Sequence, residues 1–192
     1  MPLITLLILA SLVRNDSGDR ELALRIGQGD KEAFRAFFDK YERPLISFLM
    51  SKGISREDAE DLVQNAFMII WDKRDKLLPG RSLKSFLFTI AYRRMLNLFR
   101  DRKDHNPEFA YALADTGQLP DASSETKQAM QAMQQALEVM PEKRRQVFEL
   151  CYLQELSYRE ASEVLGVAVK TIENHMACAL KDLRVALKSF IP

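Results

Sequence analysis

The sequence is poor in the residues on which most enzymes and metalloproteins depend. Its 192 residues include two cysteines, two histidines, one tryptophan and seven glycines. His105 and His175 lie far apart, so no zinc-ligand spacing follows from them. No glycine-rich stretch has the form of a phosphate-binding loop, and no nucleophile is paired with a base. We therefore expect no enzyme, no catalytic residue, no metal site, no cofactor and no small-molecule substrate.

Long hydrophobic runs are absent apart from one at the N-terminus. Residues 1–13 are nearly all apolar, but this run is too short to span a bilayer. It has no basic leader and no clear cleavage site, so we do not interpret it as a signal peptide. We regard residues 1–18 as an atypical apolar extension, either a misassigned start or a short extra helix. Cys151 and Cys178 are then expected to be free thiols in a reducing compartment, the cytoplasm.

Neither sign of charge is in excess over the whole chain, whose formal net charge is +1. The distribution is uneven, however. Residues 81–103 contain seven basic residues and one acidic residue, whereas residues 57–61 contain four acidic residues. A basic surface and an acidic surface on one protein indicate two different partners.

The segment from Leu156 to His175 has the pattern of a helix-turn-helix. Ser157 and Glu160 form a capping box that starts a helix, and Gly166 supplies the left-handed residue that ends it. A second helix should begin near residue 169 and bury one side, made of Val169, Ile172, Met176, Ala179 and Leu183. Its other side has amide and basic groups that suit base edges and phosphates, although a solvated bundle helix would look similar. In a helix-turn-helix, this second helix lies in the major groove of DNA.

The rest of the chain also predicts helices, because no segment shows the two-residue alternation of a strand. Polar caps predict helix starts at Asp30, Ser55 and Ser82, and Pro141 is expected at the first position of a helix that runs to Leu153. Residues 105–124 are rich in loop-forming residues and predict a flexible linker. The predicted fold class is therefore all-α, with two small helical domains at residues 19–104 and 125–192, the second containing the helix-turn-helix.

Several motifs follow one another in a characteristic order. Residues 58–67 read DAEDLVQNAF, residues 86–93 read FLFTIAYR, and residues 137–141 read LEVMP, followed by the helix-turn-helix. Together they resemble the extracytoplasmic-function class of bacterial RNA polymerase sigma factors, over about residues 19–187. The chain differs from the usual family pattern at Arg93, where asparagine is usual, at Asn97, where aspartate is usual, and at Ala168, where a capping serine is usual.

The resemblance implies a subunit that binds core RNA polymerase, recognises the minus-ten and minus-thirty-five elements of promoter DNA and helps to open the duplex. It places polymerase binding on Asp58, Asp61, Gln64 and Asn65. It places minus-ten binding on Arg81, Lys84, Phe88, Tyr92, Arg93, Arg94 and Arg100. It places minus-thirty-five binding on Arg159, Lys170, Thr171, Glu173, Asn174, His175 and Lys181.

The two aromatic residues of the minus-ten set, Phe88 and Tyr92, would stack on unpaired bases in this interpretation. Their spacing alone favours core positions instead. By resemblance, an anti-sigma factor is also an expected partner, and the protein would be nucleoid-associated when it is part of the holoenzyme.

The main alternative is a helix-turn-helix transcriptional regulator that binds DNA without acting as a sigma subunit. This hypothesis accounts for the last third of the chain. It leaves the acidic helix and the basic helix without a role, so we favour the sigma-factor interpretation.

Overall fold

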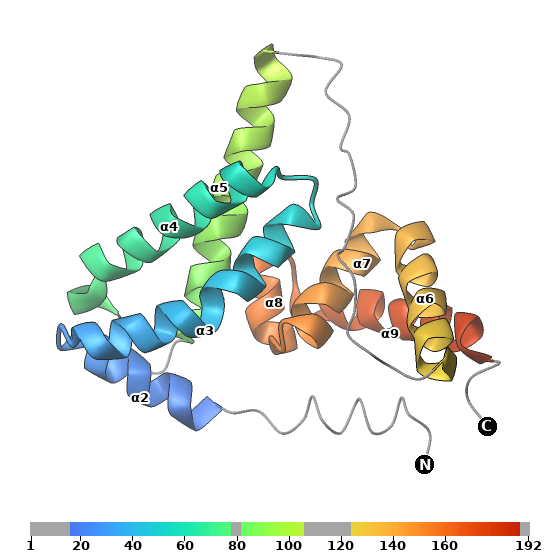
Figure 1. The fold of residues 1–192 in the computed structure, drawn as a ribbon, viewed down its shortest axis with the longest axis horizontal. Helices are drawn as coiled ribbons and strands as arrows, with labels where there is room; N and C mark the ends of the chain where they lie inside the picture. Colours follow the sequence, from blue (N-terminus) through green and yellow to red (C-terminus); the bar gives the residue numbers. More distant parts are fainter. Residues whose placement is uncertain (1–15, 78–81, 106–123, 189–192) are drawn as a thin grey trace. The chain divides into compact units, whose positions relative to one another are not determined.

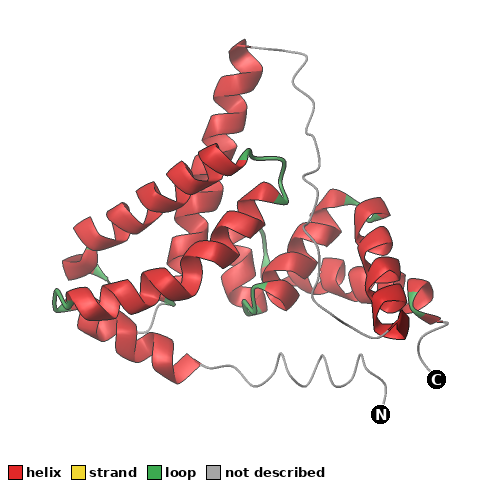
Figure 2. Ribbon diagram, in the orientation of Figure 1, coloured by secondary structure: helices red, strands yellow, loops and turns green. Residues whose placement is uncertain are grey.

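The structure, a computed structural model, describes residues 16–77, 82–105 and 124–188 (Figure 1). Every regular element in these ranges is helical, as predicted (Figure 2). The chain divides into two compact units, the first built around residues 16–105 and the second around residues 124–188. Most of the predicted N-terminal extension and nearly all of the predicted linker lie outside the described residues. None of the described helices is long and apolar enough to cross a membrane.

The first unit contains four α-helices and a short 3-10 turn. They are α2 (Asp16–Gly27), α3 (Lys31–Met50), α4 (Arg56–Asp72), η1 (Arg74–Lys76) and α5 (Leu83–His105). The three predicted caps are confirmed. The Asp30 carboxylate accepts the backbone N–H groups of Glu32 and Ala33 at 2.9 and 3.1 Å, and Ser55 and Ser82 cap α4 and α5 at 3.2 Å. Each side chain satisfies backbone donors that a helix leaves unpaired at its start.

Helix α3 is central to the first unit because it contacts α2, α4 and α5. Its aromatic side chains meet aromatic side chains of both later helices. The ring centroids of Phe37 and Phe67 on α4 lie 5.8 Å apart, and those of Phe48 and Phe88 on α5 lie 5.6 Å apart. These distances fall in the range of favourable edge-to-face and tilted pairs.

The second unit consists of α6 (Ser124–Val139), α7 (Glu142–Phe148), the π-helical turn η2 (Glu149–Leu153), α8 (Tyr158–Leu165) and α9 (Val169–Ala186). Helix α9 packs against α6 and α7. The sequence predicts one helix from Pro141 to Leu153. Pro141 instead lies at the cap position, one residue before the helix, and the α-helix changes to a π-helical turn after Phe148.

The helix-turn-helix forms as predicted from α8 and α9. Both hydrogen bonds of the Ser157–Glu160 capping box are present, and Gly166 adopts the left-handed conformation at φ 66°. Ala168 caps α9 without a side-chain hydrogen bond, as its residue type requires. Ile172, Met176, Ala179 and Leu183 are buried as predicted, but Val169 is 39% exposed, so its assignment to the buried side was wrong. Val169 is the first residue of the helix, where no neighbouring turn covers it.

Glu155, between η2 and α8, allows a test of local backbone strain. It has a φ of 51° and is the one described non-glycine residue with positive φ. The left-handed conformation costs a residue with a Cβ about 1–2 kcal/mol, and glycine offsets part of that gain through its greater freedom when unfolded. We expect Glu155→Gly to raise the free energy of unfolding by roughly 0.5–1 kcal/mol. Urea unfolding followed by circular dichroism measures it, with Gln154→Gly, at an ordinary φ of −100°, as a control that should destabilise. A loss of stability in Glu155→Gly would contradict the strain.

Candidate protein and nucleic-acid interfaces

One side of α4 is a polar surface that no described element covers. Ala59, Val63, Ala66, Phe67 and Ile70 form the buried side of the helix. On the other side Asp61, Gln64 and Asn65 are exposed, as predicted, and Met68 is 62% exposed beside them. We call these last four residues the α4 face. It presents a carboxylate, two amides and an adaptable thioether, a combination that suits contact with another protein.

Asp58 differs from the rest of the predicted polymerase-binding set. Its carboxylate accepts a hydrogen bond from Arg102 Nη2 on α5 at 2.7 Å and another from the Ser55 hydroxyl. The Ser55 hydroxyl, and next the Arg102 guanidinium, hold the pKa of this carboxyl below its ordinary value. Asp58 therefore fastens the start of α4 to the last turns of α5. Both hydrogen bonds go to the same oxygen, Oδ2, so Asp58 has a role within the unit, and its contact with polymerase stays a prediction.

The exposed side of α5 is strongly basic. Arg93, Arg94 and Arg100 are exposed, and Arg100 forms an ion pair with its neighbour Asp101, at 3.6 Å between Nε and Oδ1. Leu96, 47% exposed, lies among them in the sequence. Lys84, near the start of the helix, is half-buried with its Nζ 5.5 Å from the ring centroid of Tyr41. Arg81 lies outside the described residues.

Phe88 and Tyr92 are core residues, which corrects the prediction that they stack on bases. Phe88 is fully buried and Tyr92 is 8% exposed. Their ring centroids lie 5.6 and 6.4 Å from that of Phe48 on α3. A ring that packs against a neighbouring helix has no free face for a base. Residues 88 and 92 share the side of α5 that also buries Met95 and Phe99, opposite the basic side.

The predicted minus-thirty-five residues lie on α8 and α9. Lys170, Asn174 and Lys181 are exposed and recur at intervals of four and seven residues, so they share one side of α9. Thr171, Glu173 and His175 are half-buried, and Arg159 on α8 is exposed. Lys170 Nζ lies 2.9 Å from Glu173 Oε2. From residue 170 to residue 181 the side spans about 16 Å at 1.5 Å per residue, a length that fits within a major groove.

Two exposed apolar residues, Met68 and Leu96, are not among the predicted binding residues. The hydrophobic pattern of each helix could have indicated these two positions, because both residues fall outside the apolar stripe that predicts the buried side. The pairing of Asp58 with Arg102 could not be read from the sequence, because the two residues are far apart in the chain and meet only when α4 packs on α5.

Both helical units match conserved regions of a transcription initiation factor. Residues 37–105 match the family model described as Sigma-70 region 2, and residues 130–183 match Sigma-70, region 4. The ferric citrate uptake sigma factor FecI of Escherichia coli is 30% identical over 154 residues, covering 77% of this chain and 87% of its own. The ECF sigma factor RpoE of Cereibacter sphaeroides is 28% identical over 158 residues, covering 81% and 86%.

Solved structures show the same fold. The structure of CnrH in complex with the cytosolic domain of CnrY is 25% identical, with a TM-score of 0.61, and the match covers 90% of this chain and 99% of that one. RpoE in complex with the anti-sigma factor NepR from Bartonella quintana is 26% identical, with a TM-score of 0.63, and the match covers 81% and 96%. The chain belongs to the extracytoplasmic-function RNA polymerase sigma factors.

A member of this family is a promoter-specific sigma factor, an initiation factor that serves the polymerase and does not itself synthesise RNA. The match to region 2 covers most of the first unit, which the alternative of a simple helix-turn-helix regulator leaves without a role. That alternative is not favoured.

The fastening of α4 to α5 has a pH dependence that can be measured. Because folding lowers the pKa of Asp58, its carboxylate adds to the free energy of unfolding. This contribution is fully present above the pKa of the unfolded state, about 3.8, and is lost as the pH falls through the pKa of the folded state. We expect Asp58→Asn to lower the free energy of unfolding at pH 7 by about 1 kcal/mol, and to differ less and less from the unsubstituted protein below pH ~3.8.

A double-mutant cycle with Arg102→Ala assigns this effect to the pair. The Asp58→Asn substitution should cost less in the Arg102→Ala background, where the Ser55 hydrogen bond is what remains to be lost. Asp61→Asn, on the exposed part of α4, should change stability little in either background. Equal costs of Asp58→Asn with and without Arg102 would show that the pair contributes nothing.

Proposed function

We propose that the two units of this sigma factor divide the work of promoter recognition between them. The first domain, residues 19–104, binds core polymerase and the minus-ten element. The second, residues 125–192, binds the minus-thirty-five element, and residues 105–124 connect them. The observation that carries this proposal is that the first unit exposes a polar face on α4 and a basic face on α5 while it buries the opposite sides of both helices.

The α4 face is the proposed docking surface for core polymerase. Asp61 supplies a negative charge and Gln64 and Asn65 supply amides, all at exposed positions. Asn65 also donates a hydrogen bond to the backbone carbonyl of Asp61 at 2.9 Å, which holds its side chain against the helix. Met68 adds an apolar contact that would become buried on docking. Such a mixture of a few polar groups around an apolar one is typical of protein interfaces.

Helix α5 is the proposed surface for the minus-ten element. Arg93, Arg94 and Arg100 are placed to neutralise backbone phosphates, and Lys84 lies at the start of the same helix. Each neutralised phosphate releases counterions, so binding should weaken steeply with salt. Since Phe88 and Tyr92 are buried, base stacking by these two rings is not part of the proposal.

Helix α9 is the proposed reader of the minus-thirty-five element. Asn174 is exposed in its second turn and carries the amide that pairs with adenine in a major groove. Lys170 and Lys181 lie on the same side and suit phosphates, and Arg159 on α8 is placed for a further backbone contact. Thr171, Glu173 and His175 border this side.

Two further proposals rest on relatives. The solved structures of CnrH and of RpoE contain the cytosolic domain of CnrY and the anti-sigma factor NepR, respectively. An anti-sigma partner that covers the polymerase-binding surface is accordingly proposed for this chain. The proposed location is the cytoplasm, in association with the nucleoid when the holoenzyme forms.

Charge reversal on the α4 face tests the docking surface. Asp61→Arg should weaken association with core polymerase by roughly tenfold or more, because a buried like-charge contact replaces a favourable one. Fluorescence titration of labelled protein with purified core polymerase measures the affinity. Asp39→Arg, the same change at an exposed position of α3, is the matched control and should bind normally. Normal binding by Asp61→Arg would remove the α4 face from the interface.

Two substitutions on α9 separate base recognition from phosphate contact. Asn174→Ala should reduce the preference for the cognate minus-thirty-five element by about 1–3 kcal/mol in discrimination, with polymerase affinity unchanged. Lys181→Ala should weaken binding to all sequences alike and reduce the slope of log K against log salt by about one. Holoenzyme binding to promoters with substituted upstream elements measures both. Full discrimination by Asn174→Ala would show that Asn174 does not recognise bases of the minus-thirty-five element.

A further inference from the structure

Arg74, just after the end of α4, makes two contacts with Trp71. Its Nη1 donates a hydrogen bond to the backbone carbonyl of Trp71 at 2.7 Å. Its guanidinium carbon lies 4.5 Å from the ring centroid of Trp71, a cation–π distance. The other neighbour of the Trp71 ring is Phe34 of α3, with centroids 4.9 Å apart. The guanidinium is thus tied to an aromatic pair that joins α3 to α4.

The turn between α2 and α3 lies against the same residue. A Cβ placed on Gly29 would lie 3.8 Å from Arg74 Nε, and one placed on Gly27 would lie 3.5 Å from the Arg74 carbonyl oxygen. Gly29 has a φ of 84°, a conformation for which glycine is suited. Helix α2 contacts η1, the 3-10 turn that Arg74 begins.

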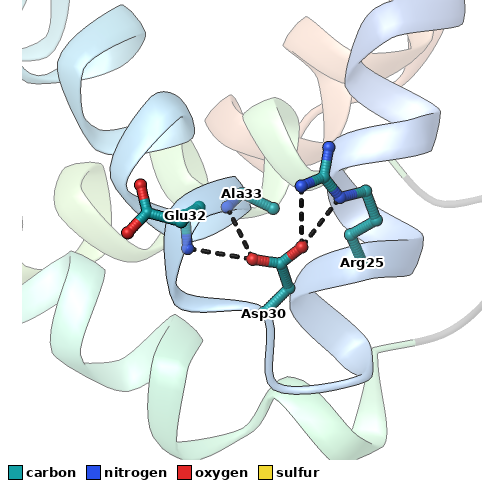
Figure 3. A network of polar contacts seen from close by, with 4 residues as sticks. All are labelled: Arg25, Asp30, Glu32 and Ala33. Carbon is teal, nitrogen blue, oxygen red and sulfur yellow. Dashed lines mark hydrogen bonds and ion pairs between the residues drawn. The ribbon is translucent and has the colours of Figure 1, made fainter.

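Side-chain hydrogen bonds close the turn between α2 and α3 (Figure 3). Asp30 accepts two backbone hydrogen bonds at the start of α3 and, through its other oxygen, the Nε and Nη2 groups of Arg25 at 2.8 and 2.7 Å. The Ala33 backbone N–H, followed by Arg25, lowers the pKa of the Asp30 carboxyl. The surface against which Arg74 rests is therefore fixed by its own hydrogen bonds.

The consequence is a defined direction for the chain as it leaves α4. Asp75 and Lys76 follow Arg74 and are exposed. Helix α2, which contacts η1, also contacts α5, the helix proposed to bind the minus-ten element. Arg74 uses its planar guanidinium on Trp71 and its backbone on the α2–α3 turn, so it acts within the protein and not on a phosphate.

We propose that Arg74 is a positioning residue for minus-ten recognition, which fixes the exit from α4 by bridging Trp71 to the glycine turn between α2 and α3. The inference rests on the proposed function of the first unit, and it names a residue that neither the α4 face nor the basic side of α5 includes. Its predicted effect is on the choice of minus-ten sequence, not on affinity for polymerase.

Three variants of the full chain, each assembled with core polymerase, test the proposal. Arg74→Ala removes the contacts. Arg74→Lys keeps the charge but loses the planar group that stacks and donates in a fixed direction. Lys73→Ala removes one charge from the neighbouring exposed position and is the matched control. The measurement is the rate of open-complex formation on the cognate promoter relative to promoters with a substituted minus-ten element, repeated over a range of salt concentrations.

The proposal predicts that the discrimination ratio falls roughly tenfold in both Arg74 variants, the ratio that corresponds to losing one interaction of this class. It should stay unchanged in Lys73→Ala. The salt slope, the polymerase affinity and the discrimination at the minus-thirty-five element should equal those of the unsubstituted protein in all three.

Restoration of discrimination by Arg74→Lys would show that charge alone matters and would overturn the proposal. So would a salt slope reduced by about one in Arg74→Ala, because that is the mark of a lost phosphate contact. If the unsubstituted holoenzyme did not discriminate at the minus-ten element, the proposed function itself would fail. If it discriminated and Arg74→Ala did so equally, only the positioning role would fail.

Discussion

The aromatic packing of α3 against α4 and α5 is the constraint on which the first unit depends. Phe37 packs against Phe67 of α4, and Phe48 packs against Phe88 of α5. These contacts fix which side of α4 and which side of α5 faces α3. When one side of an α-helix packs into the core, the residues on its opposite side face outward, so the ring contacts determine which residues are exposed. The polar face of α4 and the basic face of α5 are in this sense consequences of where the rings lie. The residues proposed to contact polymerase and DNA are then ones that do little for the core.

Polar contacts between elements of the first unit add to the aromatic packing. Asp58 joins the start of α4 to Arg102 near the end of α5, and Arg74 joins the end of α4 to the turn between α2 and α3. The resemblance assigned Asp58 to polymerase binding, whereas Arg74 belonged to no predicted site. In the folded chain Asp58 pairs with Arg102 of α5, and Arg74 places its planar guanidinium on the Trp71 ring. A charged residue of a binding protein can therefore serve recognition without touching the ligand, and the distinction rests on geometry rather than on residue type.

The sequence predicted local features well and tertiary ones unevenly. The caps at Asp30, Ser55, Ser82 and Ser157 and the turn at Gly166 were predicted because each needs only neighbouring residues. The spacing of Phe88 and Tyr92 favoured the core, where both lie, and the resemblance assigned them to bases instead. The π-helical turn after Phe148 and the buried ion pair of Arg145 with Glu149, 3.7 Å apart, had no signal in the hydrophobic pattern. Most of the N-terminal extension and nearly all of the linker lie outside the described residues.

Run-off transcription with purified core polymerase tests the central claim most directly. The claim is that one chain supplies both polymerase docking and recognition of two promoter elements. The account predicts transcripts with defined start sites, at a fixed distance downstream of two shared sequence elements, only when this chain is added to core polymerase. Binding of the chain to DNA without any initiation, or initiation that is insensitive to either element, would contradict it.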